Sequence, residues 1–187
     1  MQPATITHVG QDIRALRKGR GLTLAALSAR INRSTGWLSH LERGQIEPGI
    51  TDLKLIASVF DIPLSLLFRN ADAPAHEQGT IVRAANRTRL GTEDDGLLEE
   101  FLSPGLSGPF EMIRSTFQPG AQSGILPARP TTEAGYVASG EFEIWLGKDH
   151  HHLQTGDSFQ FTEKVHRWRN PGADPAVLIW IISPPIY

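Results

Sequence analysis

The sequence contains no cysteine, only two methionines and no long run of apolar residues among its 187 positions. Without cysteine, disulfides, thiolate metal sites and cysteine nucleophiles are excluded, so any metal site would need histidine and carboxylate ligands. No run of 18 apolar residues is present to predict a membrane-spanning helix. The N-terminal stretch MQPATITHVG also lacks the apolar core of a signal peptide. We therefore expect a cytoplasmic protein with no membrane partner.

The overall charge balance conceals two different halves. The chain is 40% hydrophobic and 20% charged with a net charge of -2, a composition typical of a globular protein of one large or two small domains. Residues 1–70 carry nine Lys and Arg against five Asp and Glu, whereas residues 71–187 carry nine against fifteen. A basic first part beside an acidic second part indicates a polyanion partner for the first part only.

The period of the apolar residues changes once along the chain. From Val9 to Phe68 they recur at helical spacing, and from Ile81 onward they alternate at strand spacing between Gly and Pro. The polar segment between them has no apolar periodicity and is typical of a linker. We therefore predict a helical domain over 1–70, a linker over 71–80 and a strand-rich domain over 81–187.

The first domain is predicted to contain five short helices, over about residues 9–20, 23–31, 34–43, 51–60 and 64–68. Thr23 and Ser34 have the side chains preferred at helix N-caps. The third helix is predicted to turn Trp37, Leu38 and Leu41 inward. Its outward positions are small and polar: Thr35, Gly36, Ser39 and His40.

Two such helices joined by a tight turn form a helix-turn-helix arrangement. The segment Gly10–Phe68, above all LRKGRGLT, LSHLERG and IEPGITDL, resembles the DNA-binding domain of the Xre family of transcriptional regulators, similar to the lambdoid phage repressors. The resemblance implies a five-helix, lambda-repressor-like domain that binds a double-stranded DNA operator. Because one motif buries little area on DNA, we expect a homodimer on a pseudo-palindromic operator. A generic helical bundle is the alternative.

The resemblance also assigns individual DNA contacts. The positions that face base edges in the family are Thr35, Gly36, Ser39, His40 and Arg33, and those that hold phosphates are Arg17, Thr23, Ser34 and Arg43. The chemistry agrees, because arginines, hydroxyls and helix N-termini suit phosphate oxygens. Gly36 has no side chain to read a base, so the operator sequence cannot be deduced.

The second domain offers nine short strand candidates, at residues 81–90, 96–103, 110–118, 133–139, 141–147, 150–154, 157–162, 166–170 and 176–183. This pattern indicates an antiparallel sandwich or barrel. The region of about Phe110–Ser183 resembles the two motifs of the cupin superfamily. The resemblance lies in four segments that follow one another along the chain: PGAQS, YVASGEFEIWLG, LQTGDSFQF and HRWRNPG. The whole chain is thus predicted to be a two-domain α plus β protein whose C-terminal part is an antiparallel double-stranded β-helix, a jelly-roll-like barrel.

Three consecutive histidines, His150 to His152, are the most obvious metal candidate. They follow the predicted hairpin turn Gly147-Lys148-Asp149. Strand alternation sends His150 and His152 to one face and His151 to the other, so the three rings do not converge on one ion. We predict a solvated hairpin edge, with a metal site as the alternative.

The metal site that the cupin resemblance implies is incomplete. Glu133 and His166 occupy two of its ligand positions, but the usual pair of histidines is missing and Arg129 stands near that place. One histidine and one glutamate are too few for tight binding, and an arginine opposes a dication. We therefore predict no metal, no cofactor and no catalytic residues; a metal that did bind would complete its shell with ligand or water.

The barrel is predicted instead to bind a small polar effector, such as an amino acid or another small carboxylate. Arg129 offers a planar fork for a carboxylate, and Glu133 an acceptor for an amine. The predicted ligand-binding residues are Arg129, Glu133, His166, Tyr136, Arg114 and Trp168. The function expected is a ligand-responsive regulator and not an enzyme. The alternatives are a metal-dependent cupin dioxygenase or isomerase with a DNA-binding module, or a cupin that serves only for dimerisation.

Overall fold

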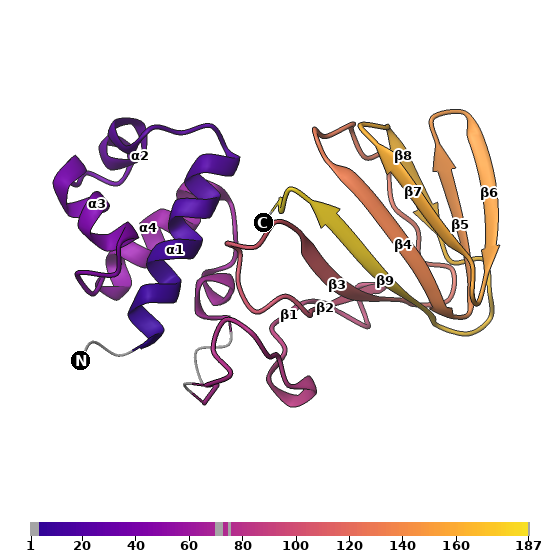
Figure 1. Cartoon of the computed structure of the whole chain (residues 1–187). Helices are drawn as coiled ribbons and strands as arrows, with labels where there is room; N and C mark the ends of the chain where they lie inside the picture. The colour runs from indigo at the N-terminus through magenta and orange to yellow at the C-terminus, as the bar shows by residue number, and fades with distance from the viewer. Residues whose placement is uncertain (1–3, 70–72, 75, 187) are drawn as a thin grey trace. The chain divides into compact units, whose positions relative to one another are not determined.

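A computed structural model describes residues 4–69, 73–74 and 76–186, with the side chains from Val9 onward. The chain forms two compact units (Figure 1). The helical unit comprises Met1–Thr88, Ser103–Pro109 and Pro185–Tyr187, and the sheet unit comprises Arg89–Leu102 and Phe110–Pro184. The predicted domain limits stay a prediction, and positions 71, 72 and 75 of the predicted linker lie outside the described residues.

The described part of the helical unit contains four α-helices: α1 (Ala4–Gly19), α2 (Leu24–Arg30), α3 (Thr35–Glu42) and α4 (Ile50–Phe60). The prediction of five was wrong in this respect, because LSLLF forms the 3-10 helix η1 (Leu64–Phe68). This segment of five residues follows Pro63, and 3-10 geometry is common in such short pieces. A second 3-10 turn, η2, spans Ala84–Asn86.

Helix starts and ends in this unit follow from local chemistry. Thr23 Oγ1 accepts a hydrogen bond from the Ala26 backbone N–H at 3.0 Å, and Ser34 Oγ accepts one from Trp37 N–H at 3.1 Å. Both predicted N-caps are therefore confirmed. Gly44, the second residue after α3, has a φ of +68°, a backbone conformation that residues with a Cβ rarely adopt.

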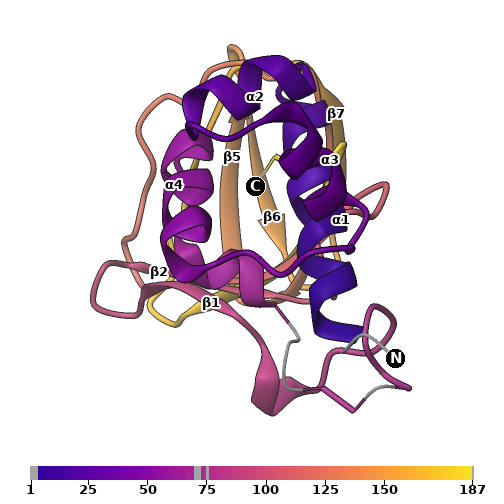
Figure 2. The same cartoon turned by 90° about the vertical axis from the view of Figure 1, so that its left-hand side faces the viewer.

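The helices enclose one apolar core. Its fully buried members include Ile13, Leu27, Leu38, Leu41, Ile56 and Leu66. Helix α3 packs against both α1 and α2 (Figure 2). This packing uses the inward side of α3 and leaves its other side exposed.

The sheet unit contains nine strands in its described residues: β1 (Arg89–Thr92), β2 (Leu97–Phe101), β3 (Glu111–Phe117), β4 (Thr132–Ser139), β5 (Glu141–Leu146), β6 (Asp149–Gln154), β7 (Ser158–Thr162), β8 (His166–Arg169) and β9 (Ala176–Ser183). They form a six-stranded sheet, in the order β1-β2-β3-β9-β4-β7, and a three-stranded sheet, in the order β6-β5-β8 (Figure 1). The strand pairs are antiparallel, as predicted.

Two details of the strand prediction were wrong. The first strand is only Arg89–Thr92, because Ala84–Asn86 forms the exposed turn η2. The turn between β5 and β6 contains only Gly147 and Lys148, since Asp149 already pairs with Leu146.

Aromatic side chains fill the space between the two sheets. Phe142 of β5 is fully buried, and its ring lies 4.9 Å from Phe117, 6.1 Å from Trp180 and 6.4 Å from Trp168, between ring centroids. Phe117 and Trp168 also meet edge to face at 4.5 Å. Because rings from both sheets interlock, this cluster fixes the position of one sheet on the other.

None of the described helices is long and apolar enough to span a membrane.

Candidate nucleic-acid interface and sheet-unit site

Helix α3 presents one exposed polar side. Leu38 and Leu41 are fully buried, whereas Thr35, Gly36 and His40 are exposed and Ser39 is half-buried. The predicted base-contacting positions of α3 thus share its outward side. A Cβ atom at Gly36 would meet only Ser34 Oγ, at 3.9 Å, so the space around this position does not require a glycine.

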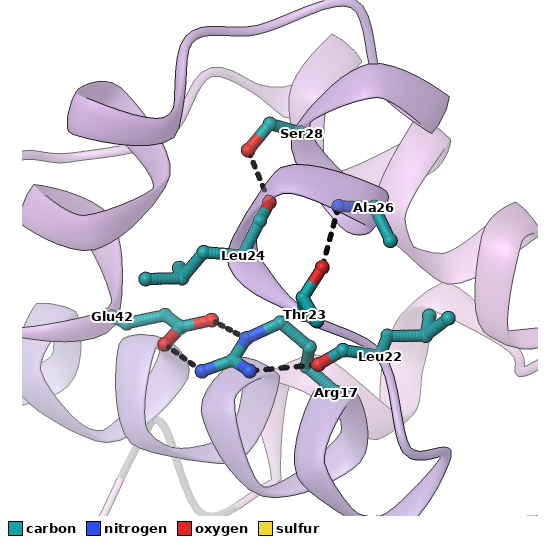
Figure 3. A network of polar contacts seen from close by, with 7 residues as sticks. All are labelled: Arg17, Leu22, Thr23, Leu24, Ala26, Ser28 and Glu42. Atoms are coloured by element: carbon teal, nitrogen blue, oxygen red, sulfur yellow. Dashed lines mark hydrogen bonds and ion pairs between the residues drawn. The ribbon is translucent and has the colours of Figure 1, made fainter.

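Arg17 takes part in a buried network that ties the helices together (Figure 3). Its Nε and Nη2 atoms donate to Glu42 Oε1 at 2.6 Å and Oε2 at 2.8 Å, and Nη1 donates to the Leu22 carbonyl at 2.8 Å. The hydrogen bond to Glu42 raises the pKa of Arg17 above its ordinary value. The phosphate contact expected of Arg17 stays a prediction, but its burial favours a structural role.

Sequence reasoning missed Glu42, although a signal was present. Glu42 lies one turn beyond Leu38 and next to Leu41, on the inward side of α3. An acidic residue on an apolar helix side needs a partner, and the basic residue at position 17 supplies it.

The other predicted DNA contacts remain at least partly accessible. Arg33 donates from Nε to Asp52 Oδ1 at 2.8 Å and lies 5.2 Å from the Trp37 ring, yet 47% of its side chain is exposed. Arg43 is exposed next to His40. The hydroxyl oxygens of Thr23 and Ser34 accept hydrogen bonds from backbone N–H groups. Each hydroxyl proton can still be donated to a phosphate.

The sheet unit brings Glu133 and His166 to the aromatic cluster. Both are buried, at 5% and 7% exposure. Glu133 Oε2 accepts a hydrogen bond from Trp180 Nε1 at 2.9 Å, and Oε1 accepts one from Thr131 Oγ1 at 3.2 Å. The His166 ring lies 6.3 Å from the Trp180 ring, so Trp180 lies beside both predicted polar groups.

The predicted ligand-binding residues do not all meet. Trp168 lies in the aromatic cluster, on the same strand as His166. Arg129 is exposed in the loop before β4, and Tyr136 is 49% exposed. Arg114 donates to Glu100 Oε2 at 2.6 Å, on the face of β3 opposite to buried Ile113.

Trp180 and Thr131 have more specific roles than the sequence suggested. Neither residue is among the predicted ligand-binding residues. No short sequence pattern reveals the hydrogen bond from Trp180 to Glu133, because 47 positions separate the two residues.

The three histidines lie along β6 as the alternation predicts. The His150 ring stacks on Trp145 at 4.5 Å, and its Nε2 lies 3.3 Å from Glu143 Oε1. His152 Nε2 lies 3.6 Å from Glu141 Oε2, whereas His151 is paired with Ile144 of the other face. Within the described residues, no group of three or more His, Asp or Glu side chains is arranged to hold a metal ion.

Comparison with known proteins identifies both halves. A helix-turn-helix family model matches residues 13–67, and a cupin domain model matches residues 113–182. The transcriptional regulator ClgR of Mycobacterium tuberculosis is 31% identical over 100 residues, which cover 53% of this chain and 89% of ClgR. The chain belongs to the Xre-type helix-turn-helix transcriptional regulators.

Other relatives share more of the length of this Xre-type regulator. The HTH-type transcriptional regulator PuuR of Escherichia coli is 22% identical over 166 residues, 88% of each chain. A crystal structure of an HTH_3 family transcriptional regulator from Vibrio cholerae aligns with a TM-score of 0.46 at 23% identity and covers 99% of both chains. The two family models and the likeness to ClgR make the protein a transcriptional regulator with a helix-turn-helix domain and a cupin domain, and membership of this family implies DNA binding.

Proposed function

We propose that this regulator reads an operator with α3 and changes its DNA affinity when the cupin domain binds a small polar molecule. The observation that carries the proposal is the exposed polar side of α3, held on a buried core by the Arg17–Glu42 pair. A rigid helix with accessible polar groups suits the major groove, where base edges are read.

The proposed DNA contacts follow the exposed groups. Base edges are assigned to Thr35, Gly36, Ser39, His40 and Arg33, and phosphates to Thr23, Ser34 and Arg43. Because the fold does not require Gly36, we propose that the missing side chain lets the start of α3 approach the DNA closely. Arg17 is left out of the contact set because it is buried and paired.

The proposed DNA-binding form is a homodimer on a pseudo-palindromic operator. A single helix-turn-helix unit buries a small area on DNA, and two units one helical turn apart add their contacts. The cytoplasmic location expected from the sequence remains a prediction.

The proposed effector site lies around Glu133, His166 and Trp168. Arg129 is exposed in the loop before β4, and Arg114 is bonded to Glu100, so neither lies beside Glu133 and His166. A carboxylate as the effector therefore has less support than the sequence suggested. Glu133 accepts hydrogen bonds, and His166 has a ring nitrogen that can do so. These groups favour a small polar molecule that carries hydrogen-bond donors beside an apolar part.

We also propose that the cupin domain is not a metalloenzyme. Glu133 and His166 supply two of the three or more protein ligands that catalytic metal sites usually have. Stoichiometric iron, manganese or zinc in the purified protein, lost in both Glu133→Ala and His166→Ala, would revive the enzyme alternative.

The coupling of the two domains is tested by thermal shift with a library of small polar metabolites, with and without operator DNA. The operator is first obtained by sequencing the DNA fragments that the protein retains. We expect a metabolite whose apparent affinity changes when operator is present, because linkage is reciprocal. Independent binding of DNA and metabolite would contradict the coupling, and absence of any metabolite shift would favour a cupin used for dimerisation alone.

A further inference from the structure

His40, at an outward position near the end of α3, is in contact with a glutamine that lies just beyond the helix. His40 Nδ1 lies 2.7 Å from Gln45 Oε1. Both residues are exposed, and neither is needed for the buried core. The predicted DNA-binding set contained His40 but not Gln45.

The contact determines which nitrogen of the imidazole carries the proton. An amide carbonyl oxygen can only accept a hydrogen bond, so Nδ1 must donate. In a neutral ring the other nitrogen, Nε2, is then an acceptor. Gln45 therefore favours the tautomer that presents a lone pair at Nε2.

Arg43 favours the opposite tautomer of His40, but it lies farther from the ring than Gln45. Its Nη2 lies 3.4 Å from the same Nδ1, and a guanidinium N–H can only donate. This contact is at the outer limit of hydrogen bonding, whereas 2.7 Å is at the short end of the range. The Gln45 contact therefore prevails.

We infer that Gln45 is a positioning residue for sequence recognition, which holds His40 as a hydrogen-bond acceptor toward an exocyclic amino group in the major groove. Adenine N6 and cytosine N4 are the groups of this kind. A ring protonated at Nε2 would instead select acceptors, which are N7 and O6 of guanine, N7 of adenine and O4 of thymine, and would find none on cytosine. The inference rests on the proposed reading of DNA by α3.

The first test measures the tautomer in the free protein, without DNA. Nitrogen-15 NMR of labelled protein at about pH 8, where most histidine rings are neutral, distinguishes Nδ1–H from Nε2–H. His40→Ala assigns the signal. We expect Nδ1–H in the wild type, a mixed or reversed tautomer in Gln45→Met, and no change in the matched variant Gln11→Met. An Nε2–H ring in the wild type, or an unchanged ring in Gln45→Met, overturns the inference.

The second test measures base preference by sequencing DNA fragments selected by each variant. At the base read by His40, we expect the wild type to prefer A or C by roughly two- to tenfold, the effect of one neutral hydrogen bond. Whether A or C is preferred shows which of the two amino groups His40 contacts. Gln45→Met should reduce this preference to under about twofold. Gln45→Lys, which donates to Nδ1, should extend binding to the bases that offer acceptors, including G and T, and should disfavour C.

The outcomes separate the two hypotheses. A wild type that selects no DNA sequence contradicts the proposed function, while the NMR result still decides the tautomer. Specific binding whose preference is unchanged in Gln45→Met and Gln45→Lys contradicts the role of Gln45 and leaves the proposed function intact.

Discussion

Two of the buried glutamates, one in each unit, are held in different ways. Glu42 of the helical unit and Glu133 of the sheet unit are both 5% exposed. Glu42 binds the guanidinium of Arg17 with both oxygens, whereas Glu133 accepts hydrogen bonds from the neutral donors Trp180 and Thr131. A bidentate ion pair fixes a carboxyl group completely. Two single neutral donors leave acceptor positions on its oxygens for a ligand.

The difference agrees with the different partners that are proposed for the two units. The helical unit uses its buried charges for its own fold and places its binding groups on the surface, on the outer side of α3. The sheet unit holds the groups of its proposed site inside, beside the aromatic cluster. Polar groups on an exposed helix suit the binding of a large polyanion. Buried polar groups suit a small molecule, which gives up its hydration water when it binds.

The largest effect is expected from Glu42→Gln. The substitution leaves the guanidinium of Arg17 buried without its counter-charge, which should lower the free energy of unfolding by about 3 to 5 kcal/mol. Chemical denaturation followed by circular dichroism at 222 nm measures the loss. Glu47→Gln, at an exposed position of the same unit, is the matched control. A loss below about 1 kcal/mol would show that the pair does not organise the unit.

A second prediction concerns Asp12, another buried acidic residue of the helical unit. Its Oδ1 accepts a hydrogen bond from the Leu106 backbone N–H at 2.8 Å, and burial raises its pKa above the ordinary value. Asp12→Ala leaves that N–H buried without its acceptor and should cost about 1 to 3 kcal/mol. Asp12→Asn keeps an acceptor oxygen and should cost less.

The raised pKa of Asp12 also predicts a pH dependence. The folded state binds this proton more tightly than the unfolded state, so the stabilisation is complete below the unfolded pKa and is lost as the pH rises through the raised folded pKa. The Asn variant has no such loss, so its stability relative to the wild type should increase with pH in that range. Denaturation curves from about pH 3 to pH 7 measure it, since the ordinary pKa lies near 4. A difference that is constant with pH would refute the account.

Glu133→Gln makes the same chemical change in the sheet unit and should have a much smaller effect. The amide keeps an acceptor for Trp180 and a polar partner for Thr131, and it removes a buried acid, so stability should change by under about 1 kcal/mol. Thermal unfolding of the ligand-free protein measures it. A loss as large as that of Glu42→Gln would remove the distinction between the two glutamates.

Much of the fold could be predicted because its signals are local. The N-caps at Thr23 and Ser34 need only three neighbouring residues, and the strands follow from alternation with Gly and Pro between them. Two errors occurred where the local signal was weak. LSLLF is apolar but too short to separate α from 3-10 geometry, and residues 81–90 are mostly exposed, so no core selects a strand.

The sites were harder to predict because they depend on contacts between distant residues. The cupin resemblance assigned Glu133 and His166 to one site, because each occupies a motif position, and both are buried beside Trp180. Arg114 faces the other side of its strand, a matter of a single residue of register that the sequence alone does not settle. Arg17 and Glu42 lie 25 positions apart in the sequence, and they form an ion pair only because α3 packs on α1.

The smallest effect is expected on the outer face of the three-stranded sheet, where His150 contacts Glu143. Their side chains are 45% and 16% exposed, and an accessible pair of this kind contributes about 0.2 to 1 kcal/mol. A double-mutant cycle with His150→Ala and Glu143→Gln should give a coupling energy within that range. At a pH of about 5, where most histidine rings are charged, the coupling should decrease in high salt. The same cycle with added Zn²⁺ tests the metal alternative for the three histidines. Because His151 pairs with Ile144 of the opposite face, zinc should leave the coupling unchanged. A zinc-dependent rise in melting temperature that is lost in His150→Ala would show instead that the hairpin edge binds a metal, and that charged groups on this outer face serve a ligand as Glu133 is proposed to do inside.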